Sequence, residues 1–325
     1  MALTGLLLSD RLPLATLAAV ARRGEELGYA ILWVPEESGK DAFTQLAALA
    51  LNTSRVRLAT GSVNCFSRTP YLMAMSAAAL QEASAGRFTL VMSSGEGGGI
   101  ASSHGLSYDR PITRLREYAV VVMALLNGDE VRRSGETISI AHAQLGFRPE
   151  RPPPVYLAGV GPRLRRVAGE VADGALFSFA TVDLMRAIVA QVREAARGVG
   201  RDPSSVDVAC YVTAGADARA EPAVRASLAR TAAMPPQNRM LNEAGFAAEA
   251  ERIAKAAASG EPGAAQRAVT DRMLDALAVV GRDSWLRRAE AMREVGVALP
   301  TAAPILEGQD AQTELLEAAT TFRPS

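Results

Sequence analysis

The sequence predicts an α/β protein, a (β/α)8 TIM barrel with a helical insertion near the C-terminal third. Apolar runs of strand length alternate with amphipathic runs of helical length along most of the chain, which is typical of parallel βα units. There are eight strand candidates, the number that closes a parallel barrel. The first βα unit has no G-x-G-x-x-G motif, which disfavours the alternative, an open doubly wound sheet. We therefore treat residues 1–325 as a single barrel domain, a size that such barrels commonly have.

The strand candidates are short apolar segments, most of them bounded by turn-forming residues. In chain order they are residues 2–8, 30–34, 56–63, 87–92, 155–158, 175–179, 206–212 and 297–299. Because parallel strands all point the same way, their C-terminal ends should meet at one mouth of the barrel. Catalytic residues of this fold lie at that mouth.

The helix candidates carry their apolar residues on one stripe and have recognisable ends. They are residues 14–27, 43–51, 72–83, 112–126 and 284–295, with further helical sequence after the fifth, sixth and seventh strands. Thr69 and Pro70 supply an N-cap and a first helical residue for the third of these helices. Asp109-Arg110-Pro111 is expected to cap the fourth, and Gly28 to end the first.

Two segments interrupt the alternation. Residues 131–149 alternate in polarity and predict a small hairpin excursion. Residues 219–268 are rich in alanine and charge and contain Pro235-Pro236, which predicts a helical insertion without strands. Regular order resumes over residues 271–280.

Composition excludes several classes of function. The chain has 35 basic and 35 acidic residues, so nothing in its charge favours nucleic acid or a membrane as partner. Cys65 and Cys210 are far apart and lack metal-ligand spacing, which predicts no metal site and a reducing cytoplasm. No apolar run has the length of a membrane span, and no signal peptide is recognisable. The absence of a nucleophile elbow or Ser/His/Asp set argues against a hydrolase.

The predicted strand ends carry the candidate chemistry. Glu36 follows the second strand, and Glu96 lies in a glycine-rich stretch after the fourth, which we expect to be flexible. A turn with small and polar side chains, Ser62, Val63 and Asn64, ends the third strand. Acidic groups and exposed backbone at a barrel mouth suit the binding of a flat ligand and proton transfer to it.

A second feature at the strand ends is Gly159-Val160-Gly161, which precedes Pro162 at the start of a helix. Glycines there expose backbone N–H groups at the positive end of the helix dipole, an arrangement that suits a phosphate. A tight turn without ligand has the same sequence pattern, so this signal is weak when taken alone.

Taken together, these segments resemble the bacterial luciferase-like superfamily, and within it the branch that uses the deazaflavin coenzyme F420. The resemblance is carried by residues 26–36, 55–70, 86–96 and, most specifically, by 155–174. The overall pattern is similar to proteins of the methylenetetrahydromethanopterin-reductase type, and the resemblance covers nearly the whole chain outside residues 219–268.

The resemblance implies where a cofactor would lie. Coenzyme F420, or FMN as the alternative, would cross the barrel mouth against a non-prolyl cis peptide that maps onto Ser62–Val63. Its phosphate would be held by the N–H groups of Gly159, Val160 and Gly161. Asn64 would hydrogen-bond the ring or the ribityl chain, and Ser178 would contact the ring or the substrate. These roles are expectations carried over from the family.

The resemblance also implies the reaction. Glu96 matches the position of a proton donor, and Glu36 matches a position where the family places an acidic residue or a histidine. We expect a reductase that transfers hydride from reduced F420 to a C=C or C=N bond of a small organic substrate, with the direction of transfer left open. The alternatives are an FMN-dependent luciferase-like monooxygenase using reduced flavin and O2, and a non-catalytic flavin-binding barrel. Members of this family commonly form homodimers.

Two departures from the family pattern bear on these expectations. The usual acid–histidine pair after the second strand is Glu36-Glu37 here, which weakens the monooxygenase interpretation. The first strand ends in Leu8-Ser9-Asp10 where a proline-containing turn is usual, so Asp10 is a candidate to face the substrate.

Overall fold

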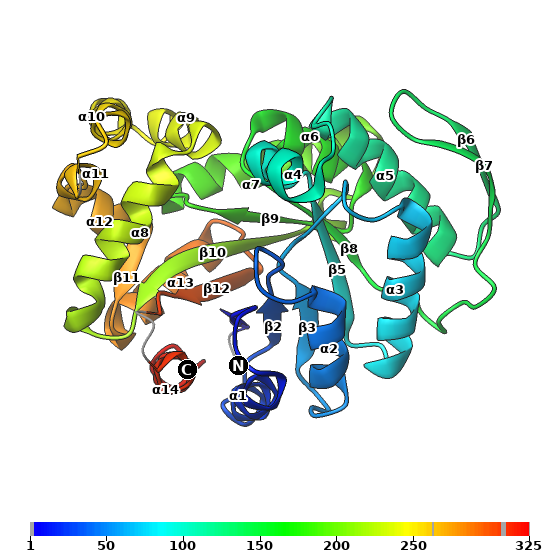
Figure 1. Ribbon diagram of the computed structural model, residues 1–325, viewed down its shortest axis with the longest axis horizontal. Coiled ribbons are helices and arrows are strands. Elements are labelled where there is room, and N and C mark those ends of the chain that lie inside the picture. The colour runs from blue at the N-terminus through cyan, green and yellow to red at the C-terminus, as the bar shows by residue number, and fades with distance from the viewer. Residues whose placement is uncertain (1–2, 262, 307–309, 325) are drawn as a thin grey trace.

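The chain folds into a closed barrel of parallel strands surrounded by helices (Figure 1). The computed structural model describes residues 3–261, 263–306 and 310–324. In the ring of the barrel, each strand pairs in parallel with its neighbours, and β10 closes the ring by pairing with both β9 and β12. The ring strands are β1 Gly5–Leu7, β2 Ile31–Val34, β3 Arg57–Thr60, β5 Phe88–Ser93, β8 Val155–Ala158, β9 Gly174–Ser178, β10 Asp207–Gly215 and β12 Leu299–Pro304.

These ring strands correspond to the eight candidates of the sequence analysis, so the predicted barrel is confirmed. The expected first strand began at Ala2, which lies outside the described residues. The last strand was placed too early, because β12 begins at Leu299 and continues to Pro304. A further strand, β11 Ala278–Val280, was missed. It pairs with β10 at Thr213–Gly215, beyond the part of β10 that pairs with β9.

The helices lie outside the ring, as Figure 1 shows. Those of the barrel are α1 Leu14–Glu26, α2 Ala42–Ala50, α3 Pro70–Ala83, α4 Gly97–His104, α5 Pro111–Leu126, α6 Pro162–Val171, α7 Val182–Gly198, α12 Asp271–Leu277, α13 Arg282–Glu294 and α14 Ala311–Thr321. Thr69 caps α3 as expected, because its side chain accepts a hydrogen bond from the Leu72 N–H and Pro70 is the first helical residue. A short 3-10 turn, η1 Pro203–Ser205, precedes β10.

Two helix starts differ from expectation. The N-cap of α5 is Arg110 in a left-handed conformation (φ 45°), and Asp109 does not cap the helix but accepts a hydrogen bond from Ser107. The glycine-rich stretch after β5 is α4, with Glu96 as its N-cap and Gly105 (φ 64°) as its C-cap. Gly97, Gly98 and Gly99 have low helix propensity, so local sequence argued against this helix.

Residues 131–149 contain the antiparallel pair β6 Val131–Ser134 and β7 Ser139–Ala143. Glu117 of α5 fixes the turn between these two strands. Its carboxylate accepts hydrogen bonds from the backbone N–H groups of Glu136, Thr137 and Ile138 and from the Thr137 hydroxyl.

Residues 219–268 are helical where they are described, and Pro262 lies outside the described residues. The helices are α8 Glu221–Ala233, α9 Pro235–Glu243, α10 Ala247–Ala258 and α11 Ala264–Arg267, preceded by the 3-10 turn η2 Ala218–Ala220. Most buried residues of α8, α9 and α10 belong to a second hydrophobic cluster, which they share with Met273, Leu274 and Leu277 of α12 and with Phe179 after β9.

A β-bulge separates β3 from the short strand β4 (Val63–Asn64). Ala59 pairs with Thr89 but Val63 pairs with Met92, so this chain segment has one residue more than the facing part of β5. The Thr60 hydroxyl compensates for the lost backbone pairing, since it accepts from the Val91 N–H (2.7 Å) and donates to the Val91 carbonyl (2.9 Å). The expected cis peptide is present in this bulge, but between Gly61 and Ser62, one bond earlier than the predicted Ser62–Val63.

Within the described residues, no helix combines the length and the apolar character that crossing a membrane requires.

Candidate active site

The floor of the barrel mouth is built from side chains that point into the barrel. Leu7, Ala158 and Tyr211 are partly exposed and pack on the buried interior cluster that contains Trp33. The Tyr211 ring meets the Trp33 ring edge-on, with 5.7 Å between centroids and an interplanar angle of 85°. This floor is mostly apolar and partly accessible from outside, which suits a flat aromatic ligand.

Tyr211 also connects the floor to the bulge. Its hydroxyl donates to the Gly61 carbonyl at 3.2 Å, and the Gly61 N–H donates to the Val34 carbonyl at 2.7 Å. A Cβ at position 61 would lie only 2.5 Å from the Tyr211 hydroxyl oxygen, so this close approach requires glycine. The bulge is therefore held from β2 and from β10 at once.

The predicted site residues of the bulge have different surroundings. Ser62 is half-buried, whereas the Val63 side chain is fully buried in the main hydrophobic core, so only the Val63 backbone can face a ligand. The Asn64 Oδ1 accepts hydrogen bonds from the N–H groups of Phe66 and Ser67. Asn64 therefore retains only its Nδ2 for a ligand.

The register of the sheet brings the bulge close to the Gly159–Gly161 loop. Asn64 pairs with Ser93, and Ser93 pairs with Ala158, so these three residues form one row across β4, β5 and β8. Neighbouring strands are about 4.8 Å apart, which places Asn64 roughly 10 Å from the start of the Gly159–Gly161 loop. Similarly, Ser178 pairs with Tyr211 and so borders the mouth floor.

Glu36 is engaged by neighbouring side chains and backbone. Its two oxygens accept hydrogen bonds from Arg68 Nη1 (2.6 Å) and Nη2 (2.8 Å), and Oε2 also accepts from the Ala42 N–H (3.0 Å). Arg68 further pairs with Asp41, the N-cap of α2. Glu36 thus ties the loop after β2 to the segment that leads into α3.

Asp10, the candidate to face the substrate, is buried, and its carboxylate is hydrogen-bonded within the protein. Its Oδ2 accepts hydrogen bonds from the N–H groups of Glu37 (3.1 Å) and Gly39 (2.9 Å), which joins the loops after β1 and β2. The pKa of the Glu37 carboxyl is raised by burial and by the nearby Asp10 carboxylate, with Arg11 acting in the opposite direction. Burial together with Glu37 raises the pKa of Tyr211 well above its ordinary value. Glu37 thus lies within electrostatic reach of the mouth floor.

Glu96 is exposed at the N-terminus of α4, and no hydrogen bond or ion pair joins its carboxylate to another described residue. Tyr108 holds the loop before it. The Tyr108 hydroxyl donates to the Ser94 hydroxyl (3.1 Å) or the Gly95 carbonyl (3.0 Å), and its ring packs where a Cβ of Gly97 would be. The structure thus leaves the Glu96 carboxylate available to a ligand while fixing the backbone around it.

The Gly159–Gly161 loop forms a partly exposed anion cradle. Contrary to the prediction, the Gly159 N–H is not available to a ligand, because it donates to the Leu176 carbonyl at 3.2 Å. Within the described part of the chain, no acceptor is recorded for the N–H groups of Val160, Gly161 and Arg163. A Cβ at Gly161 would meet no atom within 4 Å, so the space in front of it is open. Three N–H donors at the start of α6 can therefore reach one anion.

Arg165 supports this loop from behind. It is 2% exposed, and it donates to the Val160 carbonyl (3.1 Å) and to the Gln191 side chain (3.1 Å). Its guanidinium also pairs with Glu243 of α9 at 2.8 Å. The position of the anion cradle is therefore coupled to the helical insertion.

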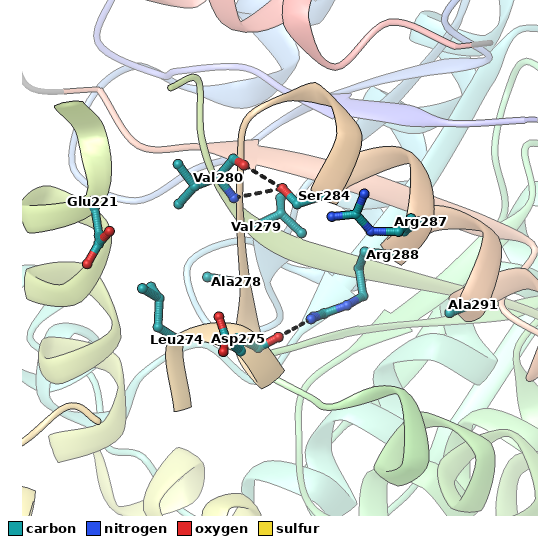
Figure 2. A pocket seen from close by; sticks show the side chains of 10 residues that line it. All are labelled: Glu221, Leu274, Asp275, Ala278, Val279, Val280, Ser284, Arg287, Arg288 and Ala291. Atoms are coloured by element: carbon teal, nitrogen blue, oxygen red, sulfur yellow. Dashed lines mark hydrogen bonds between the residues drawn. The ribbon is translucent and has the colours of Figure 1, made fainter. Parts of the chain in front are cut away.

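A pocket of about 470 Å³ lies elsewhere, between α8, α12, β11 and α13, and is shown in Figure 2. The Ser284 hydroxyl there donates to the Val280 carbonyl (2.5 Å) and accepts from the Val280 N–H (3.0 Å), and Arg288 donates to the Ala276 carbonyl (2.8 Å). None of the predicted site residues lines this pocket, so we do not assign the cofactor to it. Among the described residues no group of three His, Cys, Asp or Glu is placed to hold a metal ion.

Sequence reasoning missed three residues that shape the mouth: Tyr211, Arg68 and Tyr108. Tyr211 could have been found from the alternation along β10, where Ala209 and Tyr211 point inward and Cys210 and Val212 point outward. Arg68 and Tyr108 lie in loops, where no periodicity indicates direction. Their roles depend on partners that are distant in sequence.

The fold and the site define a class: a (β/α)8 barrel with a bulge after the third ring strand, an apolar mouth floor and an anion cradle after the fifth. The family model for luciferase-like monooxygenases matches residues 3–299. The chain belongs to this family and is an oxidoreductase.

Relatives and solved structures agree with this assignment. The 5,10-methylenetetrahydromethanopterin reductase of Methanolobus tindarius is 31% identical over 293 residues, covering 88% of this chain and 89% of the reductase. The enzyme of the same name from Archaeoglobus fulgidus is 26% identical, with 84% of each chain covered. The coenzyme F420-dependent tetrahydromethanopterin reductase of Methanopyrus kandleri has a similar structure (TM-score 0.83, 23% identity, 98% of each chain covered). These matches confirm the resemblance inferred from the sequence.

Proposed function

We propose that this protein is a coenzyme F420-dependent oxidoreductase that acts as a reductase on a C=C or C=N bond of a small organic substrate. The observation that carries the proposal is the anion cradle at Val160, Gly161 and Arg163, which follows β8 and so lies two strands across the sheet from the bulge. These three N–H groups would hold the phosphate, and Tyr211 and Leu7 of the mouth floor would contact the ring. Similar proteins are methylenetetrahydromethanopterin reductases, one of them named as dependent on coenzyme F420, and this supports the choice of cofactor.

The residues around the mouth fit such a group. The open space in front of Gly161 accommodates a phosphate, Asn64 Nδ2 can donate to the ring or ribityl chain, and Ser178 borders the ring position. When bound, reduced F420 supplies a hydride from C5. The atom of the double bond that does not receive the hydride requires a proton, so the site needs an acid within reach of the substrate.

We assign the acid to Glu96 in preference to Glu36. Glu96 has a carboxylate without a recorded partner on a fixed loop end, whereas both Glu36 oxygens are hydrogen-bonded to Arg68. In this assignment a Glu96 Oε gives the proton to the substrate, and Glu36 positions the loop after β2.

The proposal is tested by fluorescence titration of the purified protein with oxidised F420 and, in parallel, with FMN. We expect tight binding of F420 and little binding of FMN. Preference for FMN would instead support a monooxygenase that uses reduced flavin and O2. Failure to bind either cofactor would support a non-catalytic barrel.

The anion cradle is tested separately by Gly161→Asp. We expect the Kd for F420 to rise about thirtyfold, because the new carboxylate occupies the phosphate position and repels the phosphate. The fold should tolerate the change, since a Cβ at this position meets no atom within 4 Å and the backbone there is extended (φ −81°, ψ 158°). Gly146→Asp is the matched control, because Gly146 also has open space around it and lies in an exposed loop. Equal affinity of the two variants would contradict the assignment.

We also propose that the protein forms a homodimer through the outer face of α3. Tyr71, Leu72 and Met75 are exposed there at 38%, 48% and 47%. Three large apolar side chains on one helix surface are typical of a contact region. A monomeric mass in light scattering at micromolar concentration would contradict this.

The cytoplasm is the compartment that we propose. Its support is the state of Cys65 and Cys210, which are both free and buried. Secretion of the native protein into an oxidising compartment, tested by cell fractionation, would contradict it.

A further inference from the structure

A groove between α5 and α6 begins next to the anion cradle. The two helices pack against each other, and the groove between them has a volume of about 420 Å³. Three arginines line it: Arg116 from α5, and Arg163 and Arg166 from α6. Arg163 directly follows Gly161-Pro162, so its backbone N–H belongs to the cradle while its side chain lines the groove. The groove therefore adjoins the anion cradle through Arg163.

Arg116 and Arg166 each form an ion pair that leaves some of their N–H donors unused. Glu170 is 13% exposed and pairs with Arg166 Nε at 2.6 Å and with Arg116 Nε at 3.5 Å. Both contacts use Nε, and no described residue is recorded as accepting from their Nη groups. A guanidinium fork with unused Nη donors is suited to bind a carboxylate or phosphate.

The acidic residues of the groove do not compete for these donors. Glu117 and Glu136 also line it. The Glu117 oxygens already accept the hydrogen bonds of the hairpin turn, and Glu136 pairs with Arg110 at 2.5 Å. The exposed side chain of Arg163 has no recorded ion pair with a described residue. The groups of the groove that can still bind a ligand are thus the N–H donors of its arginines.

We propose that this groove binds the carboxylate-bearing tail of coenzyme F420. Beyond its phosphate, F420 carries a lactyl group extended by glutamates, whereas FMN ends at its phosphate. The inference rests on the proposed function. Arg163 lies closest to the phosphate along the chain, and Arg166 and Arg116 are the next cations along the groove. The groove therefore discriminates between the two cofactors by a part of the molecule that is remote from the reacting ring.

The experiment compares F420 that bears glutamates with F420 from which the glutamates have been removed, using fluorescence titration of the full-length protein. We expect Arg166→Glu and Arg116→Glu each to raise the Kd of the glutamylated form about tenfold, through loss of one ion pair and repulsion by the new charge. The Kd of the form without glutamates should change less than about twofold. Raising the salt concentration should weaken only the glutamylated form appreciably, since the contacts are exposed to solvent.

Two controls accompany these variants. Arg186→Glu makes the same exchange at an exposed arginine of α7 that is also paired with an acidic residue, Asp183, and should leave both affinities unchanged. Arg166→Lys keeps the charge and should retain most of the affinity for the glutamylated form. Circular dichroism of each variant shows whether the loss of a Glu170 partner has disturbed the fold.

The outcomes separate this inference from the proposed function. If wild-type protein binds both forms of F420 equally tightly and the variants change neither, the groove is not the tail site, although the F420 assignment stands. If the variants weaken both forms equally, the arginines act on the phosphate and the inference is overturned. If wild-type protein prefers FMN, both the proposed function and the inference fail.

Discussion

Replacing Glu96 with glutamine is expected to lower kcat by a factor of about 10² to 10⁴ while leaving the affinity for F420 unchanged. Glutamine has nearly the shape of glutamic acid but cannot donate the proton. Glu96 lies at the N-terminus of α4, and its loop is fixed by Tyr108 rather than by the Glu96 side chain, so the exchange should not disturb the backbone. The measurement is the oxidation of reduced F420 with a substrate found by screening C=C and C=N compounds.

The pH profile gives a second readout of the same variant. An acid that donates a proton in the reaction makes turnover fall once it is deprotonated, and Glu96→Gln should remove that limb of the profile. Glu36→Gln is the matched control, because its oxygens bind Arg68 and the Ala42 N–H. We expect it to affect stability and KM more than kcat. Full turnover of Glu96→Gln with an unchanged pH profile would show that Glu96 is not the acid.

Replacing Glu117 with alanine is expected to destabilise the β6–β7 hairpin by about 3 kcal/mol, since it leaves three backbone N–H groups and one hydroxyl without their acceptor. Glu117 is only 7% exposed, so water cannot readily take its place. Limited proteolysis of the segment 131–149 and urea denaturation followed by circular dichroism would both report the change. Glu130→Ala, directly before β6, is the control, because Glu130 forms only exposed pairs with Arg132 and His142. Equal proteolysis of the two variants would contradict the role of Glu117.

The contribution of Glu117 should depend on pH in a defined window. Burial by itself would raise its pKa, but the hydrogen bonds from Thr137, Glu136 and Ile138 outweigh burial and lower the pKa from the ordinary 4.5 to about 2. A carboxyl whose pKa is lower in the folded state stabilises that state above its unfolded pKa, and the effect is lost as the pH falls through its folded pKa. The difference between wild type and Glu117→Ala should therefore be constant above about pH 5 and shrink toward pH 2.

Glu25 repeats this arrangement at the end of α1. It accepts hydrogen bonds from the N–H groups of Ser54, Arg55 and Val56, and its pKa is also lowered to about 2 against the raising effect of burial. The Glu117→Ala variant should therefore still lose stability in acid, because it keeps Glu25. The comparison with Glu117→Ala isolates the share of one carboxylate.

The ring strands could be predicted because each is a short apolar segment whose pattern is local. The cap at Thr69-Pro70 was predicted for the same reason, since a cap involves only neighbouring residues. The start of α5 could not be predicted in this way. The expected cap Asp109 accepts from Ser107 instead, and Arg110 takes up the left-handed conformation at the N-cap.

Local pattern was a poorer guide where tertiary packing overrides propensity. The glycines of α4 favour a loop, yet Ile100 is buried in the main core and the helix ends in a left-handed Gly105. Strand β11 begins directly after the last residue of α12, so no turn separates the two in the sequence. Its pairing with Thr213–Gly215 of β10 identifies it as a strand.

The sequence by itself determined the barrel, the order of its strands and the presence of carboxylates and glycines at the strand ends. Only the tertiary structure decided what those groups can do. It engaged Glu36 with Arg68 and left the Glu96 carboxylate without a recorded partner among the described residues. It also brought the Tyr211 hydroxyl within hydrogen-bonding distance of the Gly61 carbonyl, which is 150 residues away in the chain. Periodicity specifies which face of an element is buried, whereas the partner of a polar side chain is specified by which loops the closed barrel brings together.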